Sequence, residues 1–230
     1  MKHPWIAFVP YAIVSMGHLV AIVIGAPAVV VDAAATARMP LLALGVVLVM
    51  QGASRSSAII LLLAAIALSW FGGLSGSFLG EGLSLPMMLL FFGLAHLCYI
   101  WLFGRRLAVA RVPWWALVYA VWWVGIIAVL WPRLGNLTIA VAVYGLVLAG
   151  TAITASRCHP LIAWGGAVFL ASDTFLSLVI FFPDAVSGWG FPMAMLTYNL
   201  GQGLLAVGTI IAVRAARSNR EHEPVAAATA

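Results

Sequence analysis

Long runs of apolar residues recur along almost the entire chain, and short polar or glycine-containing breaks separate them. An α-helix of about 20 apolar residues is long enough to cross the hydrocarbon core of a bilayer. The pattern therefore predicts an all-α, polytopic membrane protein, a bundle of eight transmembrane helices. Their expected bounds are Trp5–Gly25, Met39–Ala53, Ser57–Gly80, Pro86–Gly104, Pro113–Trp131, Asn136–Ala155, Pro160–Phe182 and Gly190–Val213.

The second predicted span is the shortest, with 15 residues unless it begins near Ala33. No segment between the spans is long enough to form a separate domain. We therefore expect one transmembrane domain over residues 1–214, followed by a disordered cytoplasmic tail over residues 215–230.

Composition agrees with this interpretation, because hydrophobic residues make up 65% of the chain and charged residues only 7%. In soluble domains about a quarter of the residues are charged. The net charge of +5 could indicate nucleic-acid binding, but the basic residues are sorted by side of the membrane. Nine fall on one side of the eight-span arrangement: Lys2, Arg55, Arg105, Arg106, Arg111, Arg157, Arg214, Arg217 and Arg220.

Only Arg38 and Arg133 fall on the other side, together with Asp32 and Asp184. Loops rich in Lys and Arg stay in the cytoplasm. This split therefore predicts cytoplasmic N- and C-termini in a multi-pass protein of the cell membrane, plasma or inner. The basic residues then serve as topology signals and contacts for anionic membrane lipids, and no nucleic-acid partner is expected.

The acidic residues inside the spans give the strongest indication of function. Of six acidic residues, four fall in predicted loops or in the tail, and only Glu81 and Asp173 lie in apolar helical sequence. A carboxylate inside a bilayer costs about 2.5 kcal/mol or more on insertion scales, so it is rarely retained without a use. The pair predicts one shared site with acid–base chemistry.

Small residues precede Glu81 at helical spacing in the third span. Such rows let a second helix pack closely, but packing does not account for Glu81, which is expected at the outer end of the span. The alternative is an exposed acid at the outer interface. One row is Gly72, Gly76 and Gly80, and the other is Ser69, Gly73, Ser77 and Glu81.

His96 and Tyr99 share one face of the fourth span with Gly93. A lone intramembrane His is often only a hydrogen-bonded packing residue. The alternatives are a proton partner for a carboxylate or a ligand to a polar head group. In the eighth span Tyr198 and Gln202 are four residues apart, and they either line the same cavity or join helices.

Asp173 lies deep in the seventh span, with Ser172 and Thr174 beside it and Ser177 one turn further on. Such hydroxyls can hydrogen-bond a carboxylate and set its protonation. The alternative is an Asp that only pairs with another helix for assembly. If Asp173 and Glu81 share a site, one carboxyl can stay neutral as a general acid while the other activates water or stabilises a cation. That pairing suits hydrolysis of an acid-labile ether or acetal.

Motifs of other enzyme classes are missing from the sequence. A catalytic zinc needs about three protein ligands, whereas the spans contain only His18 and His96 as histidines. There is no G-x-S-x-G elbow, P-loop or dinucleotide fingerprint. We therefore expect no metal and no cofactor. Cys98 and Cys158 are expected to be small packing residues rather than a disulfide.

A function of a different class uses the same carboxylates. Intramembrane acids also serve proton relays, so a proton-coupled transporter or a lipid-binding membrane protein is the alternative. Many transporters carry paired broken helices or an inverted repeat. Pro86 and the glycines before it resemble one broken helix, but the other half of the chain has no counterpart.

Four segments together resemble the YhhN, or lysoplasmalogenase-like, membrane family. The segments FLGEGL from Phe78 and FGLAHLCY from Phe92 are similar to the family's "GD…L" and "GL…H..Y" signatures. GGAVFLASD, which ends at Asp173, is similar to "GA..F..SD", and Tyr198 with Gln202 is similar to "Y…Q". The resemblance covers the whole chain and includes the number of spans.

The resemblance implies hydrolysis of the vinyl ether of a lysoplasmalogen or related ether-lipid substrate, which releases a fatty aldehyde and a glycerophospho-base. The family's two acidic motif positions fall on Glu81 and Asp173. An un-ionised carboxyl would protonate the enol-ether carbon, and the other carboxylate would stabilise the resulting cation or activate water. Either residue can be the acid, and Asp173 is favoured because it lies deeper and is more desolvated. Tyr198 and Gln202 would orient substrate or water.

Two departures from the family pattern bear on the substrate. The family usually has Asp where this chain has Glu81, and a shift of about 1 Å in a catalytic group can cost ~100-fold in rate. The family also tends to have Lys-Pro before its second helix, where this chain has Met39-Pro40 preceded by Arg38. If that Lys contacts a phosphate, Arg38 can substitute for it, one residue out of register.

These inferences give one geometric prediction. Glu81 and Asp173 should face a single cavity between the third and seventh helices, with His96 and Tyr99 on its wall.

Overall fold

The computed structural model describes residues 4–51 and 56–227, and its regular structure there is entirely helical. The side chains of Glu81 and of residues 220–227 are not described. Eight α-helices follow one another: α1 (Val9–Val23), α2 (Ala28–Val49), α3 (Ser57–Phe78), α4 (Glu81–Trp101), α5 (Leu117–Leu134), α6 (Thr138–Ala155), α7 (Pro160–Phe181) and α8 (Gly190–Ala227). Short 3₁₀ or π segments flank them: η1 (Pro4–Phe8), η2 (Leu102–Leu107), η3 (Trp114–Ala116), η4 (Gly135–Leu137) and η5 (Pro183–Val186).

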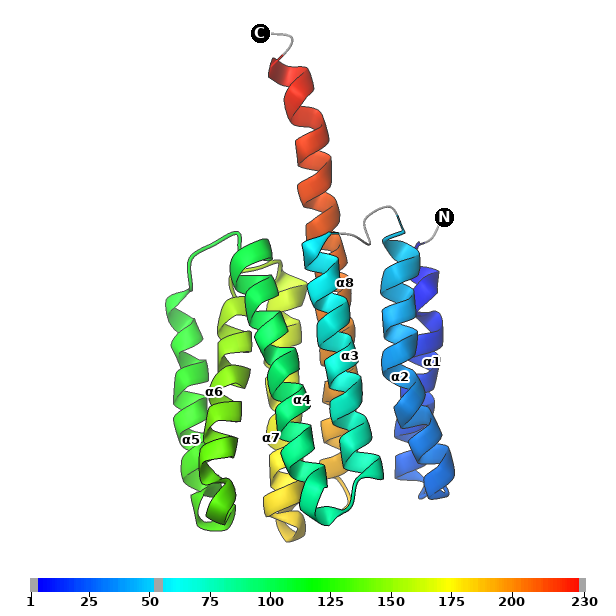
Figure 1. Ribbon diagram of the computed structural model, residues 1–230, viewed down its shortest axis with the longest axis vertical. Coiled ribbons are helices and arrows are strands. Elements are labelled where there is room, and N and C mark those ends of the chain that lie inside the picture. Colours follow the sequence, from blue (N-terminus) through cyan, green and yellow to red (C-terminus); the bar gives the residue numbers. More distant parts are fainter. Residues whose placement is uncertain (1–3, 52–55, 228–230) are drawn as a thin grey trace.

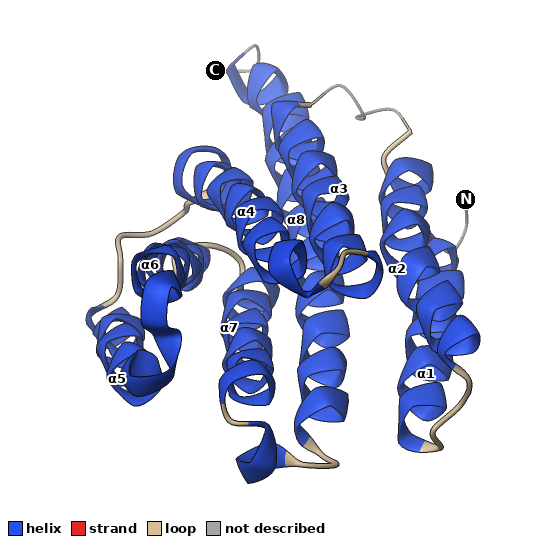
Figure 2. Cartoon of the chain, turned by 60° about the horizontal axis from the view of Figure 1, so that its bottom comes forward, coloured by secondary structure: helices blue, strands red, loops and turns tan. Residues whose placement is uncertain are grey.

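Seven helical segments of the described chain are long and apolar enough to cross a membrane. One of them, Trp114–Ala155, has 42 residues and contains both α5 and α6, which pack side by side in Figures 1 and 2. Large apolar side chains such as Val121 and Ile139 are exposed on the outside of the bundle, where they suit lipid better than water. The fold is that of a multi-pass membrane protein, and the eight-span count stays a prediction.

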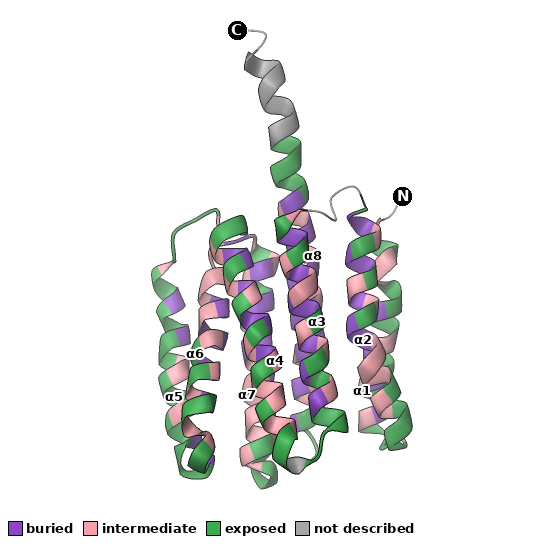
Figure 3. Cartoon of the chain, in the orientation of Figure 1, coloured by how far each residue is buried: buried purple, intermediate pink, exposed green. Residues whose placement is uncertain are grey.

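Helices that are consecutive in sequence pack as pairs, and α8 joins three of these pairs. It lies against α7 and also contacts α1, α2 and α3. Its buried residues lie within the bundle, whereas residues 214–219 are exposed where the helix continues beyond its neighbours (Figures 1 and 3). The long helix therefore provides one wall for any site between α2, α3 and α7.

Glycines set the close spacing of α3 and α4. A Cβ at Gly72 would lie 2.7 Å from the Phe92 ring, and one at Gly76 would lie 2.9 Å from the Met88 sulfur. These two glycines therefore have the packing role that the sequence predicts, between α3 and α4. Gly80 does not share it, because it caps the N-terminus of α4 and a Cβ there would meet nothing within 4 Å.

The second helix begins earlier than the sequence predicts. α2 starts at Ala28 instead of Met39, so Asp32 and Arg38 lie within a helix rather than in a loop. Ala-rich sequence between the two charges favours a helix, and Pro40 is accommodated inside it. The predicted span began after Asp32 and Arg38 because charged residues rarely face lipid. A helix can nevertheless contain both residues when its charged side faces a cavity.

Glu81 also lies on a different element from the one expected. α3 ends at Phe78, and Glu81 is the first residue of α4, which continues through Pro86. Glu81 therefore does not extend the row that begins at Ser69. A carboxylate in the first turn of a helix interacts favourably with the helix dipole, which is consistent with a helix that begins at this acid.

The chain ends also differ in part from the sequence prediction. α8 continues to Ala227, so helix occupies most of the segment from residue 215 that was expected to be disordered. Lys2 and Arg55, two of the predicted topology signals, lie outside the described residues. In Figure 1, η1 and the extension of α8 lie at the same end of the bundle.

Candidate active site

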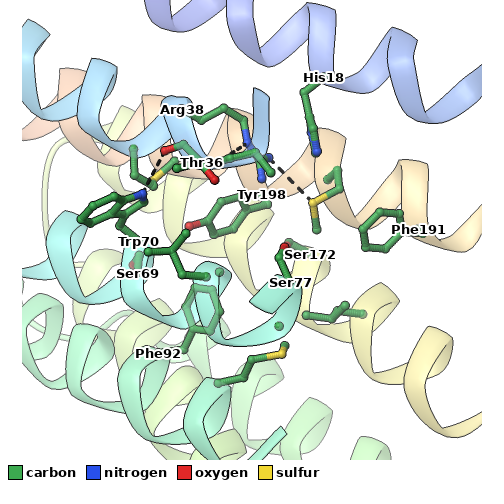
Figure 4. Close-up of a pocket in the computed structure, with 18 of the residues that line it drawn as sticks. His18, Thr36, Arg38, Ser69, Trp70, Ser77, Phe92, Ser172, Phe191 and Tyr198 are labelled. Carbon is green, nitrogen blue, oxygen red and sulfur yellow. Dashed lines mark hydrogen bonds between the residues drawn. The ribbon is translucent and has the colours of Figure 1, made fainter. Parts of the chain in front are cut away.

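A cavity of about 370 Å³ lies between α1, α2, α3, α4, α7 and α8 (Figure 4). Its volume is within the usual range for small-molecule sites, roughly 300–1,000 Å³. Most of its surface is apolar, and polar groups enter from several helices. The polar or titratable lining residues are His18, Asp32, Thr36, Arg38, Ser69, Trp70, Ser77, Ser84, Ser172, Asp173 and Tyr198.

Asp173 is on the wall of this cavity, and two helices other than its own hold its carboxylate. The Tyr144 hydroxyl on α6 donates a hydrogen bond to Asp173 Oδ2. His96 Nε2 on α4 lies 3.7 Å from the same oxygen. The Asp173 side chain is only 10% exposed, so this buried carboxyl meets the cavity from a fixed position.

His96 is positioned by α6. Its Nδ1 is 3.1 Å from Thr151 Oγ1, and that hydroxyl also lies 3.2 Å from Val147 O and 3.3 Å from His96 O. A hydroxyl has a single proton and donates to one of these groups at a time, so both tautomers of His96 fit the contact. The ring is held with Nε2 facing Asp173.

The 3.7 Å between His96 Nε2 and Asp173 Oδ2 is longer than a hydrogen bond, and Nε2 has no hydrogen-bond partner among the described residues. A proton on either group would make this contact favourable. The arrangement places an imidazole behind the carboxyl that meets the cavity.

Tyr99 and Gln202 lie behind the cavity wall. The Tyr99 hydroxyl donates to Gln202 Oε1 at 2.7 Å, and both side chains are completely buried. They join α4 to α8, which is the second of the two roles that the sequence allows for Gln202. Tyr198 has the first role, because its ring lines the cavity and packs edge-on against Phe92 and Phe169.

The predicted hydroxyl cluster around Asp173 does not form. Ser177 Oγ donates to Thr174 O at 2.8 Å, and Thr174 Oγ1 donates to Leu170 O at 2.8 Å. These hydroxyls bond their own helix, as Ser and Thr often do in apolar surroundings. Ser172 does line the cavity. Ser177 instead lines an adjoining smaller cavity of about 60 Å³, which also has Asp173 on its wall.

Two residues of the site were not predicted from the sequence: Tyr144, which hydrogen-bonds Asp173, and Thr151, which hydrogen-bonds His96. Both are on α6 and seven residues apart, so they share a helix face. Their signal in the sequence was a tyrosine in the middle of a predicted span, since interfacial tyrosines lie near span ends. Asp32 and Arg38 were missed as cavity residues because they had been assigned to a loop.

Glu81 precedes two cavity residues. Ser84 and Leu85, one turn further along α4, line the cavity from this helix. Because the Glu81 side chain is outside the described part of the structure, the pairing of Glu81 with Asp173 stays a prediction. His96 and Tyr99, which were expected on the cavity wall, lie behind it: His96 Nε2 is 3.7 Å from Asp173, and Tyr99 bonds Gln202.

Within the described residues, no three His, Cys, Asp or Glu side chains gather closely enough to hold a metal ion. Cys98 and Cys158 are free thiols, as predicted.

The chain matches the family model of the YhhN family over residues 32–209, which confirms the resemblance predicted from the motifs. No curated protein and no solved structure matches it.

Proposed function

The chain belongs to the YhhN family, and on that premise we propose that it is a membrane-embedded hydrolase that cleaves the vinyl ether bond of lysoplasmalogens or a related lipid ether. The products are a fatty aldehyde and a glycerophospho-base. We place the protein in the cell membrane, plasma or inner, with eight spans and both termini in the cytoplasm, as its basic residues favour.

One observation carries the proposal: a largely buried carboxyl, Asp173, on the wall of a largely apolar cavity, with a histidine nitrogen 3.7 Å behind it. An apolar cavity within a membrane protein accepts a lipid chain, and the carboxyl supplies the acid that cleavage of a vinyl ether requires. The adjoining cavity, which Leu176 and Ile180 also line, extends the space available for the chain.

The reaction begins when Asp173 donates its proton to the enol-ether carbon farther from the oxygen, the one that carries the alkyl chain. The C=C electrons form the new C–H bond, and an oxocarbenium ion results. A water molecule attacks this cation while a carboxylate takes one of its protons, which gives a hemiacetal. The hemiacetal collapses to the aldehyde and the alcohol of the glycerol backbone. The proton that the second carboxylate took from water passes back to Asp173 by way of water for the next cycle.

The second carboxylate is Glu81, as the family pattern implies, or Asp32. Asp32 lines the same cavity as Asp173, from α2. Glu81 begins α4, whose next turn lines the cavity. An ionised group at either position, opposite the acid, would stabilise the cation and take the proton from water.

The test is aldehyde release from a lysoplasmalogen by the purified protein, compared across four variants. We expect activity in the parent and a loss of at least ~100-fold in Asp173→Asn, because removal of a general acid typically costs 10²–10⁴-fold. Of Glu81→Gln and Asp32→Asn, the variant with a comparable loss identifies the second carboxylate. The control is Asp184→Asn, whose exposed side chain in η5 is not on the cavity wall, and it should retain parental activity.

A transporter or lipid-binding protein would use the same pair, Asp173 and His96, and the assay separates it from a hydrolase. Parental turnover in Asp173→Asn would remove Asp173 from the mechanism. A parent that releases no aldehyde, but takes up a solute into liposomes in response to a proton gradient, would favour the transporter.

A further inference from the structure

A buried arginine on the cavity wall is not neutralised by any described carboxylate. Arg38 is only 6% exposed, and the sole ion pair among the described side chains is the one between His96 and Asp173. Its hydrogen bonds go to neutral acceptors: Nη1 to Asn199 Oδ1 at 2.7 Å and to Met195 sulfur at 3.8 Å, and Nε to Ala35 O at 3.4 Å. No described atom accepts a hydrogen bond from Nη2.

Neighbouring residues hold the guanidinium in place. Asn199 accepts from Arg38, and its backbone oxygen accepts a 2.7 Å hydrogen bond from the Tyr11 hydroxyl. The guanidinium carbon lies 5.6 Å from the centre of the Tyr198 ring. Residues from α1, α2 and α8 thus fix Arg38 where it meets the cavity, so its free donors are preorganised.

A second buried polar group at the same cavity also has no partner. His18, on α1, is 1% exposed and lines the cavity, and its Nδ1 has no hydrogen-bond partner among the described residues. Figure 4 shows His18 and Arg38 along the same side of the cavity. Buried donors and charges without partners are uncommon in folded proteins, and these two face one cavity, where a single ligand can satisfy both.

We propose that Arg38 and His18 form a binding subsite for a phosphate group. A guanidinium with free N–H groups is suited to hold phosphate oxygens, and an imidazole N–H can add a further donor. Tyr198 lies against Arg38 and also lines the cavity with Asp173. A ligand with its phosphate at Arg38 would therefore lie in the same cavity as Asp173, with its chain along the apolar lining.

This subsite deepens the proposed function, on which its catalytic meaning rests, because it specifies how a phosphate-bearing lipid would be held. The same chemistry would bind a lipid head group or a free organic phosphate. Both sources are tested, and the binding measurement requires no turnover.

The experiment measures binding to the purified protein in detergent of three probes: a saturated 1-alkyl lysophospholipid, the monoalkylglycerol of the same chain length, and glycerol 3-phosphate. The first two differ only in the phosphate head group and contain no vinyl ether. We expect the parent to bind the lysophospholipid roughly 10- to 100-fold more tightly than the monoalkylglycerol, as for a hydrogen-bonded charge. Binding of glycerol 3-phosphate as tight as that of the lysolipid would assign the subsite to free phosphates.

Arg38→Gln should abolish the preference for phosphate and leave monoalkylglycerol binding intact, which also shows that the variant is folded. Arg38→Lys should retain part of it, and His18→Gln should lose several-fold. The matched control is Arg133→Gln, an exposed arginine at the end of α5, which should bind as the parent does. Equal binding of both lipids by the parent, or parental phosphate preference in Arg38→Gln, would overturn the subsite. Phosphate binding without aldehyde release would refute the hydrolase and leave the subsite standing.

Discussion

Gly201→Ala should push α8 away from α7, the helix that carries Asp173. Gly201 lies on α8 between Tyr198 and Gln202, and it faces the backbone of Phe169, one turn before Asp173 on α7. A Cβ at Gly201 would lie 3.0 Å from Phe169 N and 3.2 Å from Phe169 Cα. The nearest atoms are backbone atoms, so no side-chain rotation can relieve the contact.

The magnitude follows from these distances. Non-bonded carbon atoms are at their optimum about 3.5–4.0 Å apart, so α8 must move away from α7 by about 0.5 Å. Overpacking of this kind typically costs about 1–3 kcal/mol. At about 2–4 °C per kcal/mol for a chain of this size, the apparent Tm should fall by roughly 2–12 °C. Since a misplacement of about 1 Å can cost 10²-fold in rate, half of that predicts a roughly 10-fold loss of kcat.

The matched control is Gly125→Ala on α5, where a Cβ would meet nothing within 4 Å. It should be neutral or slightly stabilising, because Ala favours a helix over Gly by up to about 1 kcal/mol. Both variants are heated in the same detergent at one scan rate and followed by tryptophan fluorescence, since unfolding of this kind is often irreversible. A Gly201→Ala protein that melts with the Gly125→Ala protein would refute the close packing of α7 and α8 at this level.

Two further predictions concern Tyr144 and Cys158. Tyr144→Phe should lower kcat for aldehyde release by roughly 10-fold or more, because Asp173 loses the hydrogen bond that the Tyr144 hydroxyl donates to it. The control Tyr119→Phe lies away from the cavity and should keep the parental kcat. Cys158 lies outside the spans, and burial raises the pKa of its thiol to about 12. At pH 8 this thiol should therefore react with a maleimide at least ~100-fold more slowly in the folded protein than in the unfolded chain. Peptide mapping separates Cys158 from Cys98, and similar rates in the folded and unfolded protein would contradict the burial of Cys158. The folded state keeps this proton when the unfolded chain loses it above about pH 8.5, so its contribution to stability should decline as pH rises from there towards 12.

The helices were predictable because the apolar runs are long and the breaks between them are marked by Gly, Pro or Arg. Errors arose where a break and a span share residues. α3 and α4 meet at Gly80 with almost no loop, and the local sequence does not show to which of the two helices Glu81 belongs. At α2 the opposite error occurred, since Asp32 and Arg38 resembled a loop. The pattern of apolar residues predicts that a segment is a helix. Where the helix begins or ends depends also on whether its charged side chains face a cavity or lipid.

The candidate site was predictable in its residues more than in its bonds. Asp173, His96 and Tyr198 were identified because polar groups inside a membrane span are expensive. Their hydrogen-bond partners Tyr144 and Thr151 were not identified, because both lie on a different helix, α6, which contains no charged residue. Asp173 had three hydroxyl-bearing neighbours in sequence, yet it bonds a tyrosine 29 residues away. Local hydroxyls prefer the carbonyls of their own helix, so the donor had to come from elsewhere.

From the sequence, Asp32 and Arg38 were expected in a loop, with Arg38 also a candidate phosphate contact, whereas Glu81 and Asp173 were expected to carry the chemistry. The structure makes that division too simple, because Asp32, Arg38 and Asp173 line one cavity. A charge that lines a cavity avoids the cost of facing lipid, and it can then act on a ligand that enters the cavity. The positive-inside rule concerns Lys and Arg in the loops and near the ends of the spans. Arg38, as a cavity residue, is therefore no evidence for the orientation of the chain, which stays a prediction from the other basic residues.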